Sequence, residues 1–234
     1  MNTHDTPPAE AANSPLPASV PPGRLALVTG ASRGLGAALA EELAAKGWHV
    51  LCVARTTGAL EELDDRIQAK GGAATLAPMD ITDPAAMAHL AASINARWGG
   101  LGLWVHSAIY AAPLTPAGHI AEKDINRSTD INIKATMHLI AVIEPLLIAA
   151  QGTALFFDDP RAGQKFFGAY GATKAAQMAL VRSWQAETVK IGPKVVIDSP
   201  APMGTAVRGR FYPGEDRAAL TDCRIEAARI VAAL

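Results

Sequence analysis

Tyr170 and Lys174, four positions apart, are the pair of side chains in this sequence best suited to move a proton. On a helix, residues at this spacing lie on the same face and are neighbours. A nearby ammonium group favours the phenolate form of a tyrosine and lowers the pKa of the phenol toward working pH. Such a pair can pass a proton between Tyr170 and a carbonyl or alcohol oxygen, although taken alone it is more often an interfacial tyrosine and a solvated lysine.

A glycine-rich loop at residues 29–36 is suited to hold phosphate groups. It reads Thr-Gly-Ala-Ser-Arg-Gly-Leu-Gly and joins an apolar run to an Ala-rich segment with helical periodicity. Glycine permits a tight turn and a close approach of the backbone to a phosphate, and the following helix presents free N–H groups and the positive end of its dipole. In this strand–loop–helix context the loop predicts that a dinucleotide is bound, whose nicotinamide would exchange a hydride with the substrate.

The elements that position these residues follow from the alternation of short apolar runs with helical periods. Six strands are expected, at residues 25–29, 49–54, 74–78, 101–106, 153–158 and 194–198. Helices are expected at residues 34–46, 57–70, 84–98, 130–148 and 169–191. Because the strands are apolar on both faces, the sheet should be buried on both sides. This predicts a single α/β domain over residues 23–234, a Rossmann-type doubly wound parallel sheet flanked by helices.

Composition narrows the class of protein. The net charge of −1 over 234 residues gives no electrostatic reason to expect nucleic acid or an anionic membrane as a partner. Two cysteines do not make a disulfide framework, so a cytoplasmic location is expected, and no metal site is predicted. Residues 1–22 hold six of the sixteen prolines and predict a disordered Pro/Ala-rich arm without the features of a secretory signal. No apolar stretch approaches eighteen residues, and the nearest candidate, around residues 139–150, is interrupted by Glu144-Pro145.

The glycine spacing, with three residues and then one residue between the glycines, resembles that of the short-chain dehydrogenase/reductase family. The resemblance extends over about residues 24–210 and includes the family's Tyr-x-x-x-Lys motif at Tyr170 and Lys174. It implies that Asn132 is a third catalytic residue and that Tyr170 and Lys174 also contact the cofactor. The other cofactor-binding residues that it implies are Gly30, Ser32, Arg33, Gly34, Leu35, Gly36, Arg55, Asp80, Ile81, Ser107, Ala108, Pro200 and Thr205.

The charge after the second strand favours the phosphorylated cofactor. A Rossmann protein that selects NAD(H) usually places a carboxylate there, on the ribose 2′-hydroxyl. This chain has Arg55 instead, and Arg33 lies in the glycine loop. Both can pair with a 2′-phosphate, so NADP(H) is favoured and NAD(H) remains possible.

The chain departs from the family pattern where a catalytic serine is expected, at the end of the fifth strand. It reads Phe-Phe-Asp-Asp-Pro at residues 156–160, and Asp158 stands nearest to the expected position. Pteridine reductases of this family resemble that case, and a carboxylate suits proton delivery to a ring nitrogen better than it suits a developing alkoxide. Three alternatives stay open: Asp158 or Asp159 takes over the role, Ser107 supplies the missing hydrogen bond, or the chain is a catalytically degenerate cofactor-binding sensor or structural subunit.

The substrate pocket should lie over the carboxyl ends of the strands, and residues 208–215 look like a mobile lid. Its candidate walls are His106, Tyr110, Phe166, Phe167, Met203 and Tyr212. His106 either titrates near neutrality or is simply hydrogen-bonded in place. The family resemblance implies a homotetramer or homodimer formed through the two long helices; the seventh strand of the family, which would follow the last helix, is not in the sequence.

Overall fold

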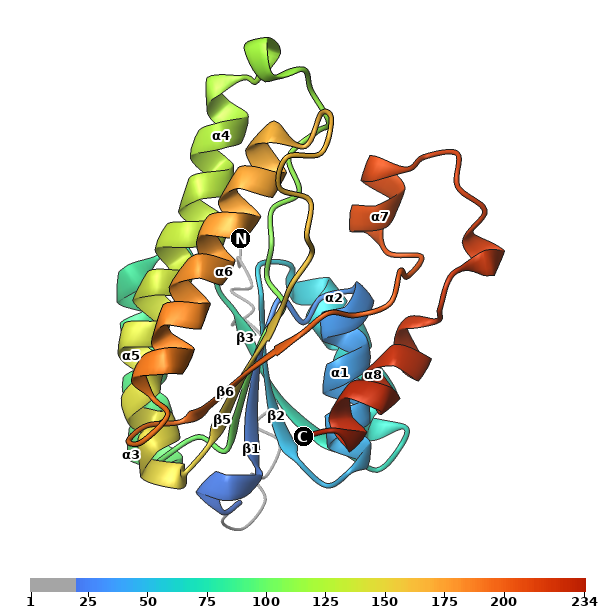
Figure 1. The fold of residues 1–234 in the computed structure, drawn as a ribbon. Coiled ribbons are helices and arrows are strands. Elements are labelled where there is room, and N and C mark those ends of the chain that lie inside the picture. Colours follow the sequence, from blue (N-terminus) through green and yellow to red (C-terminus); the bar gives the residue numbers. More distant parts are fainter. Residues whose placement is uncertain (1–19) are drawn as a thin grey trace, which may run out of the picture.

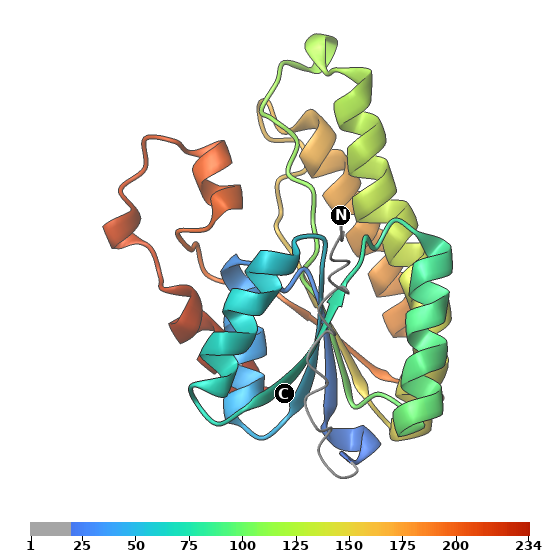
Figure 2. The same ribbon diagram turned by 180° about the vertical axis from the view of Figure 1, so that it is seen from behind.

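The computed structural model describes residues 20–234, which form a six-stranded parallel sheet with helices on both faces (Figure 1; Figure 2). The strand order is β3-β2-β1-β4-β5-β6. Strands β2 and β3 therefore lie on one side of β1, and strands β4, β5 and β6 lie on its other side. A crevice at the carboxyl ends of the strands is expected where the order reverses, between β1 and β4. The arm predicted for residues 1–22 lies outside the described residues, except for its last three.

The strands are β1 (Leu25–Thr29), β2 (His49–Ala54), β3 (Ala73–Pro78), β4 (Leu103–His106), β5 (Thr153–Phe157) and β6 (Lys194–Asp198). The helices are α1 (Gly34–Ala45), α2 (Thr57–Gln68), α3 (Pro84–Trp98), α4 (Glu122–Thr129), α5 (Ala135–Ala150), α6 (Gly168–Glu187), α7 (Ala206–Phe211) and α8 (Cys223–Ala232). The predicted doubly wound α/β domain is confirmed.

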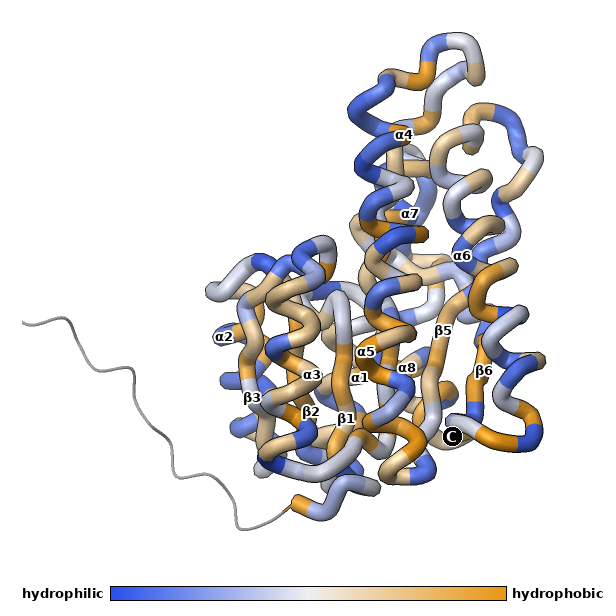
Figure 3. The backbone as a smooth tube through the Cα atoms, turned by 90° about the vertical axis from the view of Figure 1, so that its left-hand side faces the viewer, coloured by the Kyte–Doolittle hydropathy of each residue, from blue (hydrophilic) through white to orange (hydrophobic). Residues whose placement is uncertain are grey.

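Because side chains alternate along each strand, they pack into two separate hydrophobic cores, one on each face of the sheet. Leu25 and Leu27 of β1 pack on the face covered by α3, α5 and α6, whereas Ala26 and Val28 pack on the face covered by α1, α2 and α8. Successive side chains of a strand point to opposite faces, which is why a sheet covered on both sides needs strands that are apolar throughout. Figure 3 shows that the strands are mostly hydrophobic, whereas the residues of α4 are mostly hydrophilic. Cys52 is fully buried in the second core, and burial raises the pKa of its thiol to about 12.

The helix predicted for residues 130–148 begins earlier than expected. Its first part, α4, is a polar helix above the sheet, and a π-helical turn at Asp130–Lys134 joins it to α5. The joined helix, Glu122–Ala150, is long and apolar enough, by length and composition alone, to span a membrane. The interrupted apolar stretch at residues 139–150, considered alone, did not indicate this. Leu139 and Ile143 on α5 are at most 2% exposed because they pack against the sheet.

Other boundaries differ by a few residues, and two of these differences have local reasons. The fourth strand begins at Leu103 rather than at Leu101, because the Leu101 N–H donates to the Leu146 carbonyl of α5 (2.9 Å) instead of entering the ladder. Helix α6 ends at Glu187 rather than at Ile191, which lies in the following turn and is 84% exposed.

Candidate cofactor and catalytic site

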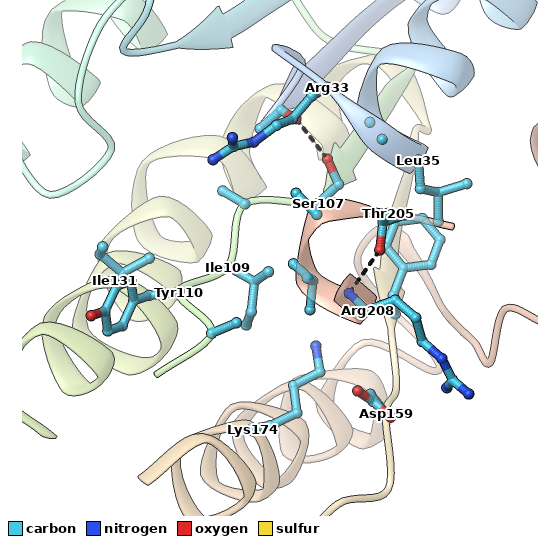
Figure 4. Close-up of a pocket in the computed structure, with 18 of the residues that line it drawn as sticks. Arg33, Leu35, Ser107, Ile109, Tyr110, Ile131, Asp159, Lys174, Thr205 and Arg208 are labelled. Carbon is cyan, nitrogen blue, oxygen red and sulfur yellow. Dashed lines mark hydrogen bonds between the residues drawn. The ribbon is translucent and has the colours of Figure 1, made fainter. Parts of the chain in front are cut away.

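A cleft of about 620 Å³ opens at the carboxyl ends of the strands, as the fold predicts (Figure 4). Every cofactor-binding residue expected from the sequence lines it: Gly30, Ser32, Arg33, Gly34, Leu35, Gly36, Arg55, Asp80, Ile81, Ser107, Ala108, Tyr170, Lys174, Pro200 and Thr205. Of the expected catalytic residues, Asp158 also lines the cleft, whereas Asn132 is fully buried behind it. Figure 4 shows Arg33 at one end of the cleft, and Lys174 beside Asp159 at the other.

The glycine loop is packed so closely that side chains are excluded. A Cβ at Gly30, whose φ is +85°, would lie 2.6 Å from the backbone nitrogen of Ala108, and one at Gly36 would collide with the Ser107 hydroxyl. Gly34, with φ +60°, opens α1, and the preceding Arg33 does not cap this helix with its side chain. The result is a bare backbone turn at a helix N-terminus, which fits a dinucleotide pyrophosphate.

Two arginines line the cleft beside this cradle. Arg33 is exposed, and the guanidinium of Arg55 lies 3.9 Å from the carboxylate of Asp80, with both side chains about half exposed. An exposed pair at this distance is weak, so Arg55 is free to contact a ligand phosphate. The Asp80 carboxylate is instead engaged by Thr82, which donates from its N–H (3.0 Å) and its hydroxyl (2.9 Å). These residues fit a phosphorylated cofactor.

Asp159, rather than Asp158, is the carboxylate that meets the tyrosine. The Tyr170 hydroxyl donates to Asp159 Oδ2 (3.0 Å), whereas Asp158 accepts from Arg182 Nη2 (2.6 Å). Burial and the negative charge of Asp159 raise the pKa of Tyr170 well above its usual value. This is opposite in direction to the lowering expected from Lys174, because a carboxylate in direct contact and the loss of solvent both disfavour the phenolate.

Lys174 is buried deeply enough for its charge to be poorly solvated. Its side chain is 7% exposed, and burial lowers its pKa to about 8, against the opposing effect of the nearby aspartates. The ammonium donates to Gln177 Oε1 (2.8 Å), one turn along α6, and Gln177 in turn donates to Thr136 of α5 (2.9 Å). Lys174 is therefore held at the cleft by its own helix rather than by an acidic partner.

Asn132 lies in the π-helical turn, and its side chain joins two elements of the site. Its Oδ1 accepts from the N–H of Tyr110 (2.8 Å), and its Nδ2 donates to the hydroxyl of Thr173 (3.0 Å) on α6. Single π-helical turns inside α-helices occur frequently at functional sites. Here the turn places Asn132 where it fixes the loop after β4 against the helix that carries Tyr170 and Lys174.

His106 is hydrogen-bonded in place and does not titrate near neutrality. It is 3% exposed, its ring nitrogens lie 2.9 Å from the Thr29 hydroxyl and 3.2 Å from that of Thr136, and burial lowers its pKa to about 3. Among the other expected walls, Tyr110, Met203 and Tyr212 line the cleft.

The expected walls Phe166 and Phe167 do not line the cleft. Phe166 is 43% exposed, and Phe167 is buried against the rings of Tyr170 and Phe211. The wall at this place is Phe211, the last residue of α7 and the neighbour of the expected wall Tyr212; it was not singled out from the sequence.

Arg161 is a second residue that the sequence did not single out. It donates from Nε to Asp159 Oδ1 (2.7 Å) and from Nη1 to the Tyr212 hydroxyl (3.2 Å). It therefore connects the carboxylate beside Tyr170 to the segment expected as a lid. In that segment Arg208 ends up in a tight ion pair with Glu215, with a 2.6 Å contact from Nε to Oε2.

Comparisons with known proteins identify the family of this chain. A family model for short chain dehydrogenases matches residues 24–216. The chain is 33% identical over 174 residues to a fatty acyl-CoA reductase of Acinetobacter baylyi, and 30% identical over 201 residues to a glycine betaine reductase of Emericella nidulans. These alignments cover 72% and 84% of this chain, but only 58% and 16% of the two relatives, so the chain spans a part of each.

Solved structures match over nearly the whole fold. A short chain dehydrogenase from Pseudomonas syringae superimposes with a TM-score of 0.81 at 28% identity, over 89% of this chain and 88% of the other. A metagenomic short-chain oxidoreductase in complex with NADP gives a TM-score of 0.76 at 26% identity, over 91% and 90%. With its Rossmann sheet, its glycine cradle and the Tyr170–Lys174 pair in one cleft, this chain belongs to the short chain dehydrogenase family of oxidoreductases.

Proposed function

We propose that this protein is an NADP(H)-dependent oxidoreductase that acts on a small substrate with a polar double bond, C=O or C=N. One observation carries the proposal: the Tyr170 phenol and the Lys174 ammonium line the same cleft as the glycine cradle. When bound, the cofactor would supply or accept the hydride. The chain's own residues would then have to hold the substrate and move one proton.

Tyr170 is the residue proposed to move that proton. Its raised pKa keeps the phenol protonated at neutral pH, so it can donate to a substrate atom that becomes basic as the hydride arrives. Lys174, still mostly charged at neutral pH, would steady the phenolate that is left. Asn132 would position α6, which carries Tyr170 and Lys174, through its hydrogen bond to Thr173.

The contact between Tyr170 and Asp159 favours C=N over C=O as the reacting bond. Reduction of C=O develops a negative oxygen, which a neighbouring carboxylate repels. Reduction of C=N adds a hydride to carbon and a proton to nitrogen, and a carboxylate favours the cationic, protonated form of that nitrogen. Tyr170 donates the proton, and Asp159 is within hydrogen-bond distance to relay its replacement from solvent.

A substrate screen tests this assignment. Turnover of NADPH with pteridines, quinones and simple carbonyls should be greatest for the C=N substrates and be abolished by Tyr170→Phe. Asp159→Asn should lower turnover of C=N substrates by about tenfold or more. The matched variant Asp158→Asn removes the contact with Arg182 and a charge that acts on Lys174 and Tyr170 from a distance, but no contact with the phenol, so it should lower turnover less. Equal losses for the two variants would contradict the assigned role of Asp159.

Tight cofactor binding without turnover on any of these substrates would instead support the alternative function, a cofactor-binding sensor or structural subunit. The presence of Tyr170, Lys174 and Asn132 together argues against it, since a site that only binds has no chemical need for all three.

Arg33 and Arg55 support the choice of the phosphorylated cofactor, as does the NADP held by a structural relative. Wild-type protein should bind NADPH more tightly than NADH in a fluorescence titration. Changing both arginines to glutamine should weaken NADPH binding by at least about tenfold and leave NADH binding unchanged, because only the 2′-phosphate is lost as a partner. The exposed Arg224 on α8, changed to glutamine, is the control. Equal affinities in the wild type would refute the preference.

We also propose that the protein forms a homodimer or homotetramer and acts in the cytoplasm, without nucleic acid or membrane as a partner. Met137 and Ile148 on α5 are each 49% exposed, which leaves apolar surface for a second copy of the chain. Both cysteines are free. Light scattering of the purified protein tests the assembly, and a monomer at micromolar concentration would contradict it.

A further inference from the structure

Two arginines from opposite walls of the cleft converge on consecutive residues of the loop after β4. The guanidinium of Arg127, on α4, lies 4.7 Å from the ring centroid of Tyr110. Arg210, on α7, donates from Nη1 to the carbonyl of Ala111 (2.7 Å). Both arginines line the cleft, and α4 and α7 stand on either side of it above the sheet (Figure 1; Figure 2). Arg127 and Arg210 are called here the arginine pair.

The arginine pair differs from the other arginines at this end of the cleft. Arg161 and Arg208 are neutralised by Asp159 and Glu215. Within residues 20–234, no carboxylate lies within 4.0 Å of either member of the arginine pair. The nearest acid on α4, Asp124, accepts a hydrogen bond from the Tyr110 hydroxyl instead (2.9 Å).

The positive charges of both members of the arginine pair act on the Tyr110 phenol. Both guanidiniums act to lower the pKa of the Tyr110 phenol, against burial and the hydrogen bond to Asp124, which raise it. Two positive groups therefore face one phenol from two elements, and Asp124 accepts the hydrogen bond of that phenol. Each guanidinium has five N–H donors, and Arg210 uses one of them on Ala111 within the described chain.

Apolar side chains line the cleft beside both members of the arginine pair. Ile109 and Ile131 line the cleft next to Tyr110, and Val207 and Phe211 line it next to Arg210. Figure 4 shows Ile109, Ile131 and Tyr110 grouped on one side of the cleft. Apolar side chains beside two guanidiniums that no carboxylate neutralises suit a ligand with an apolar body and an anionic group.

We propose that the arginine pair binds an anionic group, a carboxylate or a phosphate, on the substrate of this cleft. The planar fork of arginine matches both groups in a bidentate arrangement, which neutral substrates cannot satisfy. The inference rests on the proposed function, because it assigns the class of substrate that enters the same cleft. It predicts that the substrate is an anion whose charge lies apart from the reacting bond.

Calorimetric titration with benzoate, phenyl phosphate and the neutral control benzamide tests the proposal without any turnover. The titration is made on the full chain alone and is repeated with NADPH, so a failure of cofactor binding leaves the first result intact. At least one anion should bind about tenfold more tightly than benzamide, and Arg127→Gln should remove most of this preference without weakening benzamide. Arg210→Gln should do the same, and Arg224→Gln is the matched control.

The outcomes separate cleanly. Preference for either anion supports the proposal and identifies the group. Equal binding of all three compounds overturns it, as does the absence of anion binding at millimolar concentration or an equal loss for benzamide in the variants. Because Arg210 also holds the Ala111 carbonyl, its variant could fail to fold. Arg127→Gln, which removes no hydrogen bond recorded among residues 20–234, then decides the question by itself. Anion binding in the titration, together with no turnover of any compound in the substrate screen, would refute the proposed function and leave the anion site standing.

Discussion

Replacing Lys174 should abolish activity and at the same time increase the free energy of unfolding. We consider Lys174→Met, which keeps an unbranched side chain of similar length and removes the charge. In the native protein the ammonium is 7% exposed, and burial lowers its pKa from the usual 10.5 to about 8. The native state therefore binds this proton less tightly than the unfolded chain does, and holding the charge in the folded protein costs free energy.

The size of that cost depends on pH in a defined direction. A pKa lowered from 10.5 to about 8 corresponds to about 3 kcal/mol at pH 7, where both states are charged. At pH 10 the native lysine is already neutral and the unfolded one only partly charged, so the cost falls to about 1 kcal/mol. Losing the hydrogen bond to Gln177 subtracts about 1 kcal/mol at either pH. The variant should be more stable by about 2 kcal/mol at pH 7 and nearly equal to the wild type at pH 10.

Urea denaturation of the ligand-free protein at both pH values measures this difference. The exposed Lys190, changed to methionine, is the control, since removing a solvated charge should alter the free energy of unfolding by less than about 0.5 kcal/mol. A variant that is less stable than the wild type at pH 7, or a difference that does not shrink between pH 7 and pH 10, would refute the reasoning. Activity of Lys174→Met should nonetheless be lost, because nothing then stabilises the phenolate.

Two further predictions concern the same cleft. Gly30→Ala should abolish cofactor binding in a fluorescence titration, because its Cβ would lie 2.6 Å from the backbone of Ala108. The control is Gly58→Ala in α2, where a Cβ meets open space; it should keep cofactor binding and raise the free energy of unfolding by about 0.5–1 kcal/mol. Loss of cofactor binding in both variants would contradict the argument. The rate of NADPH oxidation should stay level between pH 5 and 7, because His106, with a pKa of about 3, is neutral throughout this range. The rate should fall as the pH rises through about 8, where Lys174 loses its charge. A step in the pH–rate profile near pH 6.5 would show that His106 is not buried as described.

The sequence by itself determined the fold and the place of the glycine cradle. Strands apolar on both faces require cover on both sides, and the glycine spacing at residues 29–36 fixes a turn that only a backbone without side chains can make. The spacing of Tyr170 and Lys174 likewise fixed their common helix face, since four residues are close to one turn. These properties are local, and local periodicity is what a sequence records directly.

Only the tertiary structure decided how the catalytic groups are paired. Asp158 and Asp159 are equivalent in sequence, but Asp158 directly follows β5 and its N–H donates to the Asp198 carbonyl at the end of β6 (2.8 Å). Its neighbour therefore points the other way, toward Tyr170, because successive side chains of an extended segment face opposite sides. The same contact reversed the expected direction of the Tyr170 pKa. A pKa depends on the nearest charge and on burial, and both are set by segments that meet only in the folded chain.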